Sequence, residues 1–144
     1  MFAVDTNLLL YAAVREYPEH EKAGHVLQAW RTGQEPWFVT WNCVYEFLRV
    51  STHASVLPKP LPLKSSLEFV QVLVDTPYFS IVNEKETHYA VLQDLATKFP
   101  RVSANLVHDF HTAAILYEQG IRVFYTADRD FLRFDFLQVI DPVH

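Results

Sequence analysis

Apolar and polar positions alternate with two different periods along the chain. Short runs rich in apolar and β-branched residues predict strands at residues 2–4, 37–41, 78–82, 121–126 and 137–140. Between them, apolar residues recur three and four positions apart, which predicts helices over residues 8–14, 18–32, 42–51, 63–74, 83–99 and 105–119. Strands that alternate with helices indicate an α/β fold, in which right-handed crossovers build a parallel sheet with helices on both faces.

Polar residues at the predicted helix starts indicate where each helix begins. Thr6 or Asn7 is expected to cap the first helix, and Asn42 the third. Asn83, with Glu86 three residues later, has the capping-box pattern. The helix that it opens is expected to turn its apolar residues inward, namely Tyr89, Leu92, Leu95, Ala96 and Phe99.

Composition narrows the class of protein. A chain of 144 residues, half of them apolar, is expected to form one globular domain over residues 1–144. Only three glycines occur and no glycine-rich phosphate loop is present. The single cysteine, Cys43, rules out an internal disulfide framework and is expected to be a small buried residue. No run is long enough to span a membrane and no leader precedes the first strand, so we expect a cytoplasmic protein.

Acidic residues follow the predicted strands. Four of them lie at a strand end or in the first turns of the next helix: Asp5, Glu46, Asp109 and Asp128. In a parallel sheet such positions converge at the carboxyl edge. Carboxylates crowded there raise one another's pKa unless a cation is present. Oxygen ligands suit Mg²⁺ or Mn²⁺ better than Zn²⁺, and such ions commonly act on phosphate.

Each acid alone also has an ordinary structural explanation. Asp5 is a plausible helix cap, Asp109 suits the first turn of a helix, and Asp128 suits a turn. Glu46 lies among apolar neighbours, where an unpaired carboxylate would be costly, but Arg49 is an ordinary partner three residues later. The shared edge, rather than any single acid, therefore indicates a metal site.

Two histidines flank the third acid. His108 and His111 lie three residues apart, so both imidazoles are near one helix face. A zinc site is conceivable there, but a structural one normally takes four ligands, often with cysteine. We expect instead that one or both lie at the rim of the cleft.

The sequence around the acids resembles PIN-domain ribonucleases, specifically VapC-type toxins of bacterial toxin–antitoxin systems. Residues 4–12, Val-Asp-Thr-Asn-Leu-Leu-Leu-Tyr-Ala, resemble the opening of that family. Residues 46–49, 105–114 and 126–131 resemble its later acidic blocks in the same order, and the loop 56–61 resembles a VapC subgroup.

This resemblance implies a fold, an activity and partners. The fold would be a PIN domain, a three-layer α/β/α sandwich around a parallel five-stranded sheet of order 3-2-1-4-5. The activity would be Mg²⁺-dependent endoribonuclease cleavage by metal-activated water, in the toxin of a VapBC-type pair. The partners would be an RNA substrate, a small VapB-like antitoxin and a second copy of the chain in a homodimer.

On this reading the acids have distinct roles. Asp5 and Asp109 are expected to be the main Mg²⁺ ligands, with Mn²⁺ able to substitute. Glu46 and Asp128 are expected to complete the catalytic site through water or a second ion.

Further side chains are expected to support that site. Thr6, Asn7 and Thr126 are expected to orient water or carboxylates by hydrogen bonds. Arg49 and Asp130 are additional candidates for support or substrate contact.

The formal net charge of −5 is unusual for an RNA-binding enzyme, but four of the negative charges are the proposed ligands. RNA contact is then expected to rest on local cations near the cleft, namely Arg49, Arg129, Lys59 and Lys64.

Two other functions stay open from the sequence. One is a PIN-like module that binds RNA or a partner without cutting it, although such modules commonly lose acids and this chain keeps all four. The other is a phosphatase of the haloacid dehalogenase type, which wants a second aspartate two residues after Asp5, where this chain has Asn7.

Overall fold

A parallel sheet of five short strands forms the centre of the protein in a computed structural model of residues 1–144. The strands are β1 (Phe2–Val4), β2 (Trp37–Thr40), β3 (Phe79–Val82), β4 (Val123–Tyr125) and β5 (Gln138–Ile140). They pair in the order β3-β2-β1-β4-β5, and every pair is parallel. The predicted fold class and strand order are therefore confirmed.

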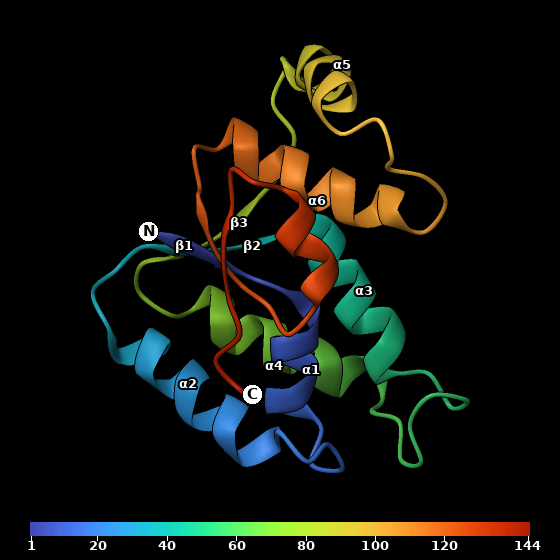
Figure 1. The fold of residues 1–144 in the computed structure, drawn as a ribbon. Coiled ribbons are helices and arrows are strands. Elements are labelled where there is room, and N and C mark those ends of the chain that lie inside the picture. The colour runs from blue at the N-terminus through green and yellow to red at the C-terminus, as the bar shows by residue number, and fades with distance from the viewer.

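Six α-helices and one 3-10 helix surround the sheet (Figure 1). They are α1 (Thr6–Ala13), α2 (His20–Thr32), α3 (Trp41–Ser51), α4 (Leu63–Val74), α5 (His88–Lys98), α6 (Leu106–Glu118) and η1 (Arg129–Arg133). None combines the length and the apolar character needed to cross a membrane.

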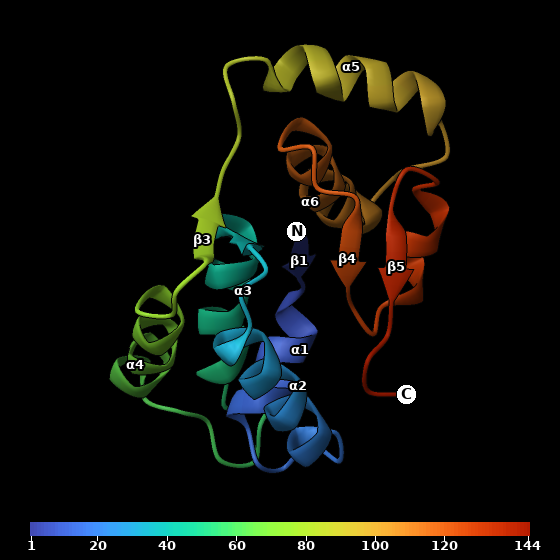
Figure 2. The same ribbon diagram turned by 90° about the vertical axis from the view of Figure 1, so that its left-hand side faces the viewer.

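The sheet has a separate apolar core on each face, because alternate residues of a strand point to opposite sides. Phe2 and Val4 of β1 pack in the core that also takes residues from α1, α2, α3 and α4. Ala3 packs in the other core, with residues of α6 and η1. Figure 2 shows α1 and α4 below the strands, α3 beginning beside β3, and α6 above β4.

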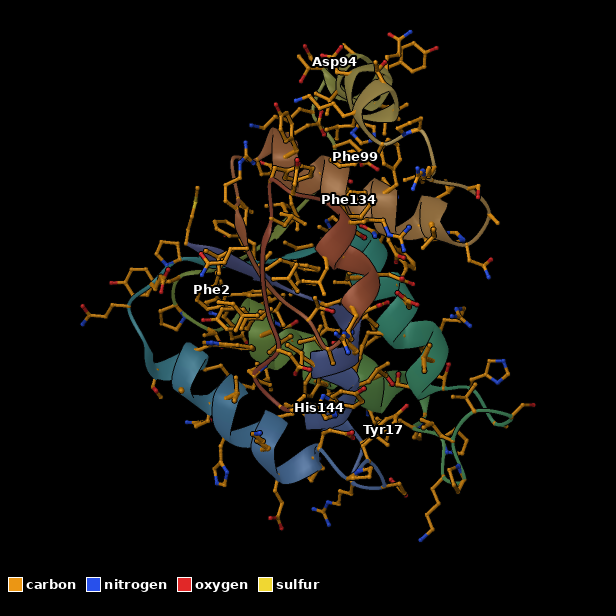
Figure 3. All side chains as sticks on the ribbon, viewed as in Figure 1. Phe2, Tyr17, Asp94, Phe99, Phe134 and His144 are labelled. Carbon is orange, nitrogen blue, oxygen red and sulfur yellow. The ribbon has the colours of Figure 1, made fainter.

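Helix α5 is the outlying element. It packs on α6 and stands away from the sheet in both ribbon views (Figures 1 and 2). Of the residues expected to face inward, only Leu95 is buried, whereas Tyr89 and Ala96 are exposed. Phe99, just after the helix, packs against Phe134 with ring centroids 5.4 Å apart (Figure 3). The inward face predicted for this helix is wrong for Tyr89 and Ala96, because α5 has only one neighbouring helix to pack on.

The first and third helices are capped by residues that precede the predicted caps. Asp5 caps α1, accepting from the backbone of Thr6, while the side chain of Asn7 is engaged elsewhere. Thr40 caps α3, accepting from the backbone of Cys43. Asn42 is instead inside the first turn, so the predictions of Thr6, Asn7 and Asn42 as caps are wrong by one or two residues.

The capping box predicted before α5 does not form. The helix begins at His88, and its cap residue Thr87 makes no side-chain capping bond. Glu84 bonds to His111 instead, and the carbonyl of Asn83 accepts from Gln119. Long-range contacts with α6 and the residues after it therefore hold this segment out of the helix.

Candidate functional site: an acidic cleft

A cleft of about 710 Å³ opens at the carboxyl edge of the sheet. Its wall includes residues of α3, α6 and η1, together with the ends of β1 and β4. Five acidic residues line it: Asp5, Glu46, Asp109, Asp128 and Asp130. The fold thus brings together the four acids singled out in the sequence and adds Asp130.

Asp5 is the most enclosed of these acids, with 7% of its surface exposed. Its Oδ1 accepts from the backbone nitrogen of Thr6 at 2.8 Å. Its Oδ2 accepts from the Thr126 hydroxyl at 2.6 Å and from Nδ2 of Asn7 at 2.9 Å. Both oxygens are therefore held in fixed directions at the end of β1.

The burial of Asp5 has an electrostatic consequence. Loss of solvent raises its pKa to about 6, although the hydrogen bonds from Thr126 and Thr6 lower it. The nearby charges of Glu46 and Asp128 raise it further. The ionised carboxylate is thus unfavourable unless a positive charge comes close.

Three further acids form a tight group. Oxygens of Asp109, Asp128 and Asp130 all lie within 4.8 Å of one another. The pKa of Asp109 is raised to about 6, first by burial and then by Asp128, Asp130 and Glu46, with Arg133 lowering it. Carboxylates at this spacing are suited to share a cation.

Glu46 is more exposed than its apolar neighbours suggested. Half of its side chain, 52%, is accessible to solvent, so the expected cost of burying it does not arise. The hydroxyl of Thr6 donates to its Oε2 at 3.2 Å. Arg49 lies 3.8 Å from its Oε1, an exposed ion pair that contributes little to stability.

A chain of polar contacts connects the ends of β1 and β4. The Thr126 hydroxyl accepts from Nδ2 of Asn7 at 3.0 Å and from the backbone nitrogen of Asp128 at 2.9 Å. Oδ1 of Asn7 accepts from the backbone of Ala127 at 3.2 Å. The side chain of Asp128 in turn accepts from the backbone of Asp130. Asn7 and Thr126 therefore tie the acids of the two strand ends into one network.

Asn42 and Thr112 are cleft residues that sequence reasoning missed. Nδ2 of Asn42 donates to the Thr112 hydroxyl at 2.6 Å, which joins α3 to α6 across the cleft wall. Oδ1 of Asn42 is buried and has no hydrogen-bond partner. Its place one turn before Glu46, on the same helix face, is the signal that would have found it.

The basic residues are only partly where the sequence suggested. Arg49 lines the cleft, and Arg129 lines a neighbouring hollow that shares Asp128 with it. Lys59 and Lys64 line neither, so the expectation that they flank the cleft is wrong. Lys64 lies on α4, on a separate shallow groove.

His108 and His111 both line the cleft, as predicted for rim residues. The two histidines do not belong to one group of possible metal ligands. His111 lies close to Glu84 and His88, whereas His108 is not part of that group. Cys43 is buried, as predicted, and burial raises the pKa of its thiol to about 12. A thiolate nucleophile is therefore absent from this cleft.

The sheet order and the carboxylates at its edge define a class: three-layer α/β/α proteins with an acidic centre. The chain belongs to the PIN-domain family, whose family model (PIN domain) matches residues 2–137. Ribonuclease VapC48 of Mycobacterium tuberculosis is 30% identical over 139 residues, covering 96% of this chain and 94% of the relative. Ribonuclease VapC33 of the same species is 30% identical and covers 99% of both chains. These relatives place the chain among the VapC-type members.

Solved structures share the fold at low sequence identity. VapBC2 from Rickettsia felis, bound to promoter DNA, superposes with a TM-score of 0.68, at 12% identity and 96% coverage of both chains. VapC20 of M. tuberculosis, a toxin that cleaves the sarcin-ricin loop, superposes with a TM-score of 0.65. It is 15% identical and covers 98% of this chain and 100% of its own.

Proposed function

We propose that the protein is a metal-dependent endoribonuclease and the toxin of a VapBC-type pair. One observation carries this proposal: five carboxylates meet in one cleft, and two of them have pKa values raised to about 6. Such a group is electrostatically unfavourable until a cation neutralises it. Full-length similarity to ribonucleases of the VapC type supports RNA as the substrate.

The donor set of the cleft fits a hard divalent cation. The five clustered acids offer only oxygen, which is what Mg²⁺ and Mn²⁺ prefer. Oδ1 of Asn42 is a further neutral oxygen, buried in the cleft wall without a hydrogen-bond partner. We therefore propose Mg²⁺ as the resident ion, with Mn²⁺ able to replace it.

Each acid then has a proposed role. Asp5 and Asp109 would hold the ion, and Glu46 and Asp128 would complete the site through water or a second ion. When bound, the ion supplies the positive charge that activates water and neutralises charge on the phosphate. Asp130 sits close enough to Asp109 and Asp128 to join them.

Supporting residues determine where these oxygens point. Thr126 and Asn7 fix Oδ2 of Asp5, and Thr6 bonds to both Asp5 and Glu46. Because these contacts use only part of each carboxylate, lone pairs stay available for an ion. We propose that their purpose is to hold the carboxylates in place for metal binding.

The cleft also offers contacts for RNA. Arg49 lines it and suits a phosphate oxygen. The ring of Tyr45 is 68% exposed at the same rim, where a single-stranded base can stack on it. We propose that these two residues position the strand, and that the enzyme acts on cytoplasmic RNA.

The proposed partners are a small VapB-like antitoxin and a second copy of the chain. Solved complexes of the same fold include VapBC-1 from Haemophilus influenzae and FitAB bound to DNA. Helix α4 keeps Leu63, Leu67 and Val74 about half exposed, an apolar face suited to burial in an interface. Size-exclusion chromatography with light scattering, with and without the co-expressed antitoxin, tests both partners.

RNA degradation by the purified protein tests the enzyme proposal. We expect Mg²⁺-dependent cleavage that EDTA abolishes. Asp5→Asn should lower the cleavage rate by at least about 100-fold, which is the upper end of the range for residues that only support a metal ligand. Asp94→Asn is the matched control, because Asp94 is exposed on α5 (Figure 3) and does not line the cleft. Full activity in Asp5→Asn would contradict the proposal.

The same assay separates the two alternatives. A phosphatase of the haloacid dehalogenase type would release phosphate from small esters, which we do not expect. A module that only binds would retain RNA on a filter in the presence of Mg²⁺ without producing new 5′ ends. Sequencing of RNA 5′ ends after induced expression would identify the target.

A further inference from the structure

A second group of metal-binding side chains lies beside the acidic cleft, on the outer side of α6. It consists of Glu84, after β3, His88, at the start of α5, and His111, on α6. One ligand atom from each lies within 4.8 Å of the others. His111 also lines the acidic cleft, so the two groups are neighbours, but they share no ligand.

His88 has the arrangement that is typical of a metal-binding histidine. Its Nδ1 lies 2.7 Å from Oε2 of Glu118, whose side chain is completely buried. A carboxylate at Nδ1 keeps the proton on that nitrogen, which leaves Nε2 as a free electron-pair donor. The hydroxyl of Thr87 also reaches Glu118, at 3.5 Å from its Oε1. The contact with Glu118 therefore fixes the orientation of the His88 ring.

Glu84 and His111 complete the donor set. Nε2 of His111 is 2.6 Å from Oε1 of Glu84, and the rings of His88 and His111 are 5.6 Å apart. The side chains of His111 and Glu84 are 36% and 33% exposed, so an ion can enter from solvent. Zinc bonds of ~2.0–2.1 Å place ligand atoms roughly 3.3 Å apart, so side-chain adjustments of about 1 Å would suffice.

The donor chemistry differs from that of the acidic cleft. Two imidazoles and one carboxylate suit a borderline cation such as Zn²⁺, with water in the fourth position, whereas the clustered acids of the cleft offer oxygen only. Besides the contacts of His88, Thr87 and Glu84 described above, two hydrogen bonds connect this region: Lys85 Nζ donates to the carbonyl of Glu118, and Gln119 Nε2 donates to that of Asn83. A cation at this point would add a strong link between the start of α5 and α6.

We propose that Glu84, His88 and His111 bind a divalent transition-metal ion of the Zn²⁺ type, with Glu118 positioning His88. The ion links the start of α5 to α6, the helix on which α5 mainly packs, beside the rim of the acidic cleft. The site is separate from the proposed catalytic centre, and its occupancy does not depend on RNA cleavage.

Calorimetric titration with ZnCl₂, in excess Mg²⁺ to occupy the acidic cleft, tests the proposal on the full chain. We expect one Zn²⁺ per chain, bound equally well by Asp109→Asn. His88→Gln and Glu84→Gln should each weaken binding at least about 10-fold, and Glu118→Gln about 10- to 100-fold. His25→Gln, at an exposed position of α2, is the matched control and should bind as the unaltered protein does.

A second readout reports the ligands directly. In the presence of Zn²⁺, the imidazole NMR signals of His88 and His111 should shift while that of His25 does not. Thermal unfolding in EDTA checks that each variant is folded, and Glu84→Gln keeps an acceptor for His111. The proposal is overturned if Zn²⁺ does not bind, if it binds His88→Gln and Glu84→Gln as well as the unaltered protein, or if Asp109→Asn abolishes binding.

Discussion

The hydroxyl of Thr126 donates a 2.6 Å hydrogen bond to Oδ2 of Asp5, across 121 positions of sequence. Val4 and Tyr125 pair in register just before these two residues. The backbone nitrogen of Asp5 also donates to the carbonyl of Tyr125 at 3.0 Å. The alignment of β1 with β4 therefore sets the position of the most buried acid in the cleft.

Replacing Thr126 with valine keeps the shape of the side chain and removes the hydroxyl. Asp5 then loses a donor, and the backbone nitrogen of Asp128 loses an acceptor. We expect a loss of about 1–3 kcal/mol in the free energy of unfolding, measured with urea at neutral pH. RNA cleavage should fall about 10- to 100-fold. The control Thr97→Val, at an exposed position of α5, should change stability by less than about 0.5 kcal/mol.

Asp109→Asn should stabilise the protein when no metal is present. In the folded protein the pKa of Asp109 is about 6, above its ordinary value of 3.8, so its ionised form costs stability above about pH 6. Solvent screens part of this cost, and we expect a gain of about 1 kcal/mol, or a melting temperature higher by about 2–4 °C.

The gain should depend on pH and on metal. Below about pH 4 the side chain at position 109 is neutral in both proteins, so the melting temperatures of variant and unaltered protein should converge. Mg²⁺ should raise the melting temperature of the unaltered protein more than that of Asp109→Asn. A variant that is less stable in EDTA at neutral pH would refute the idea that burial and neighbouring acids make ionised Asp109 unfavourable in the folded protein.

The affinity for Mg²⁺ should fall steeply in mild acid. Bound metal needs ionised carboxylates, and Asp5 and Asp109 both have pKa values of about 6. We expect a loss of about tenfold per pH unit below pH 6 for each protonated ligand, measured by titration calorimetry at constant ionic strength. An affinity that stays constant between about pH 7 and 5 would show that these two carboxylates are not ligands.

Arg49→Gln should weaken RNA binding without removing the ability to bind metal. If Arg49 contacts one phosphate, the slope of log affinity against log salt should decrease by about 0.7 for single-stranded RNA. Fluorescence anisotropy with a labelled RNA gives this slope. Both proteins in the comparison carry Asp5→Asn, so that the RNA is not cut. Arg15→Gln, at an exposed position between α1 and α2, is the control and should leave the slope unchanged.

The topology and the shared cleft followed from the sequence because both depend on strong local signals. The apolar strands and the acids at their ends are read directly from the chain, and a parallel sheet must bring such ends to one edge. The order of the strands came from resemblance to the family, since periodicity alone does not specify which strand lies beside which.

Contacts between distant segments account for the errors. The capping box of Asn83 and Glu86 does not form before α5, and this segment instead contacts α6 through Glu84 and His111, which are 27 residues apart. Glu46 looked buried because local apolar neighbours do not show which way a helix is rotated, and the helix turns it to the cleft. The group of Glu84, His88 and His111 had no sequence signal, because its members come from separate segments that only α5 and α6 bring together.

The position of a bound Mn²⁺ ion, located by anomalous X-ray scattering from crystals soaked in MnCl₂, tests the proposed metal centre most directly. The expected result is an anomalous peak in the cleft, about 2.1 Å from carboxylate oxygens of both Asp5 and Asp109. A peak found only at Glu84, His88 and His111, or none in a protein that still cuts RNA with Mn²⁺, would contradict the assignment of the acidic cleft as the catalytic centre.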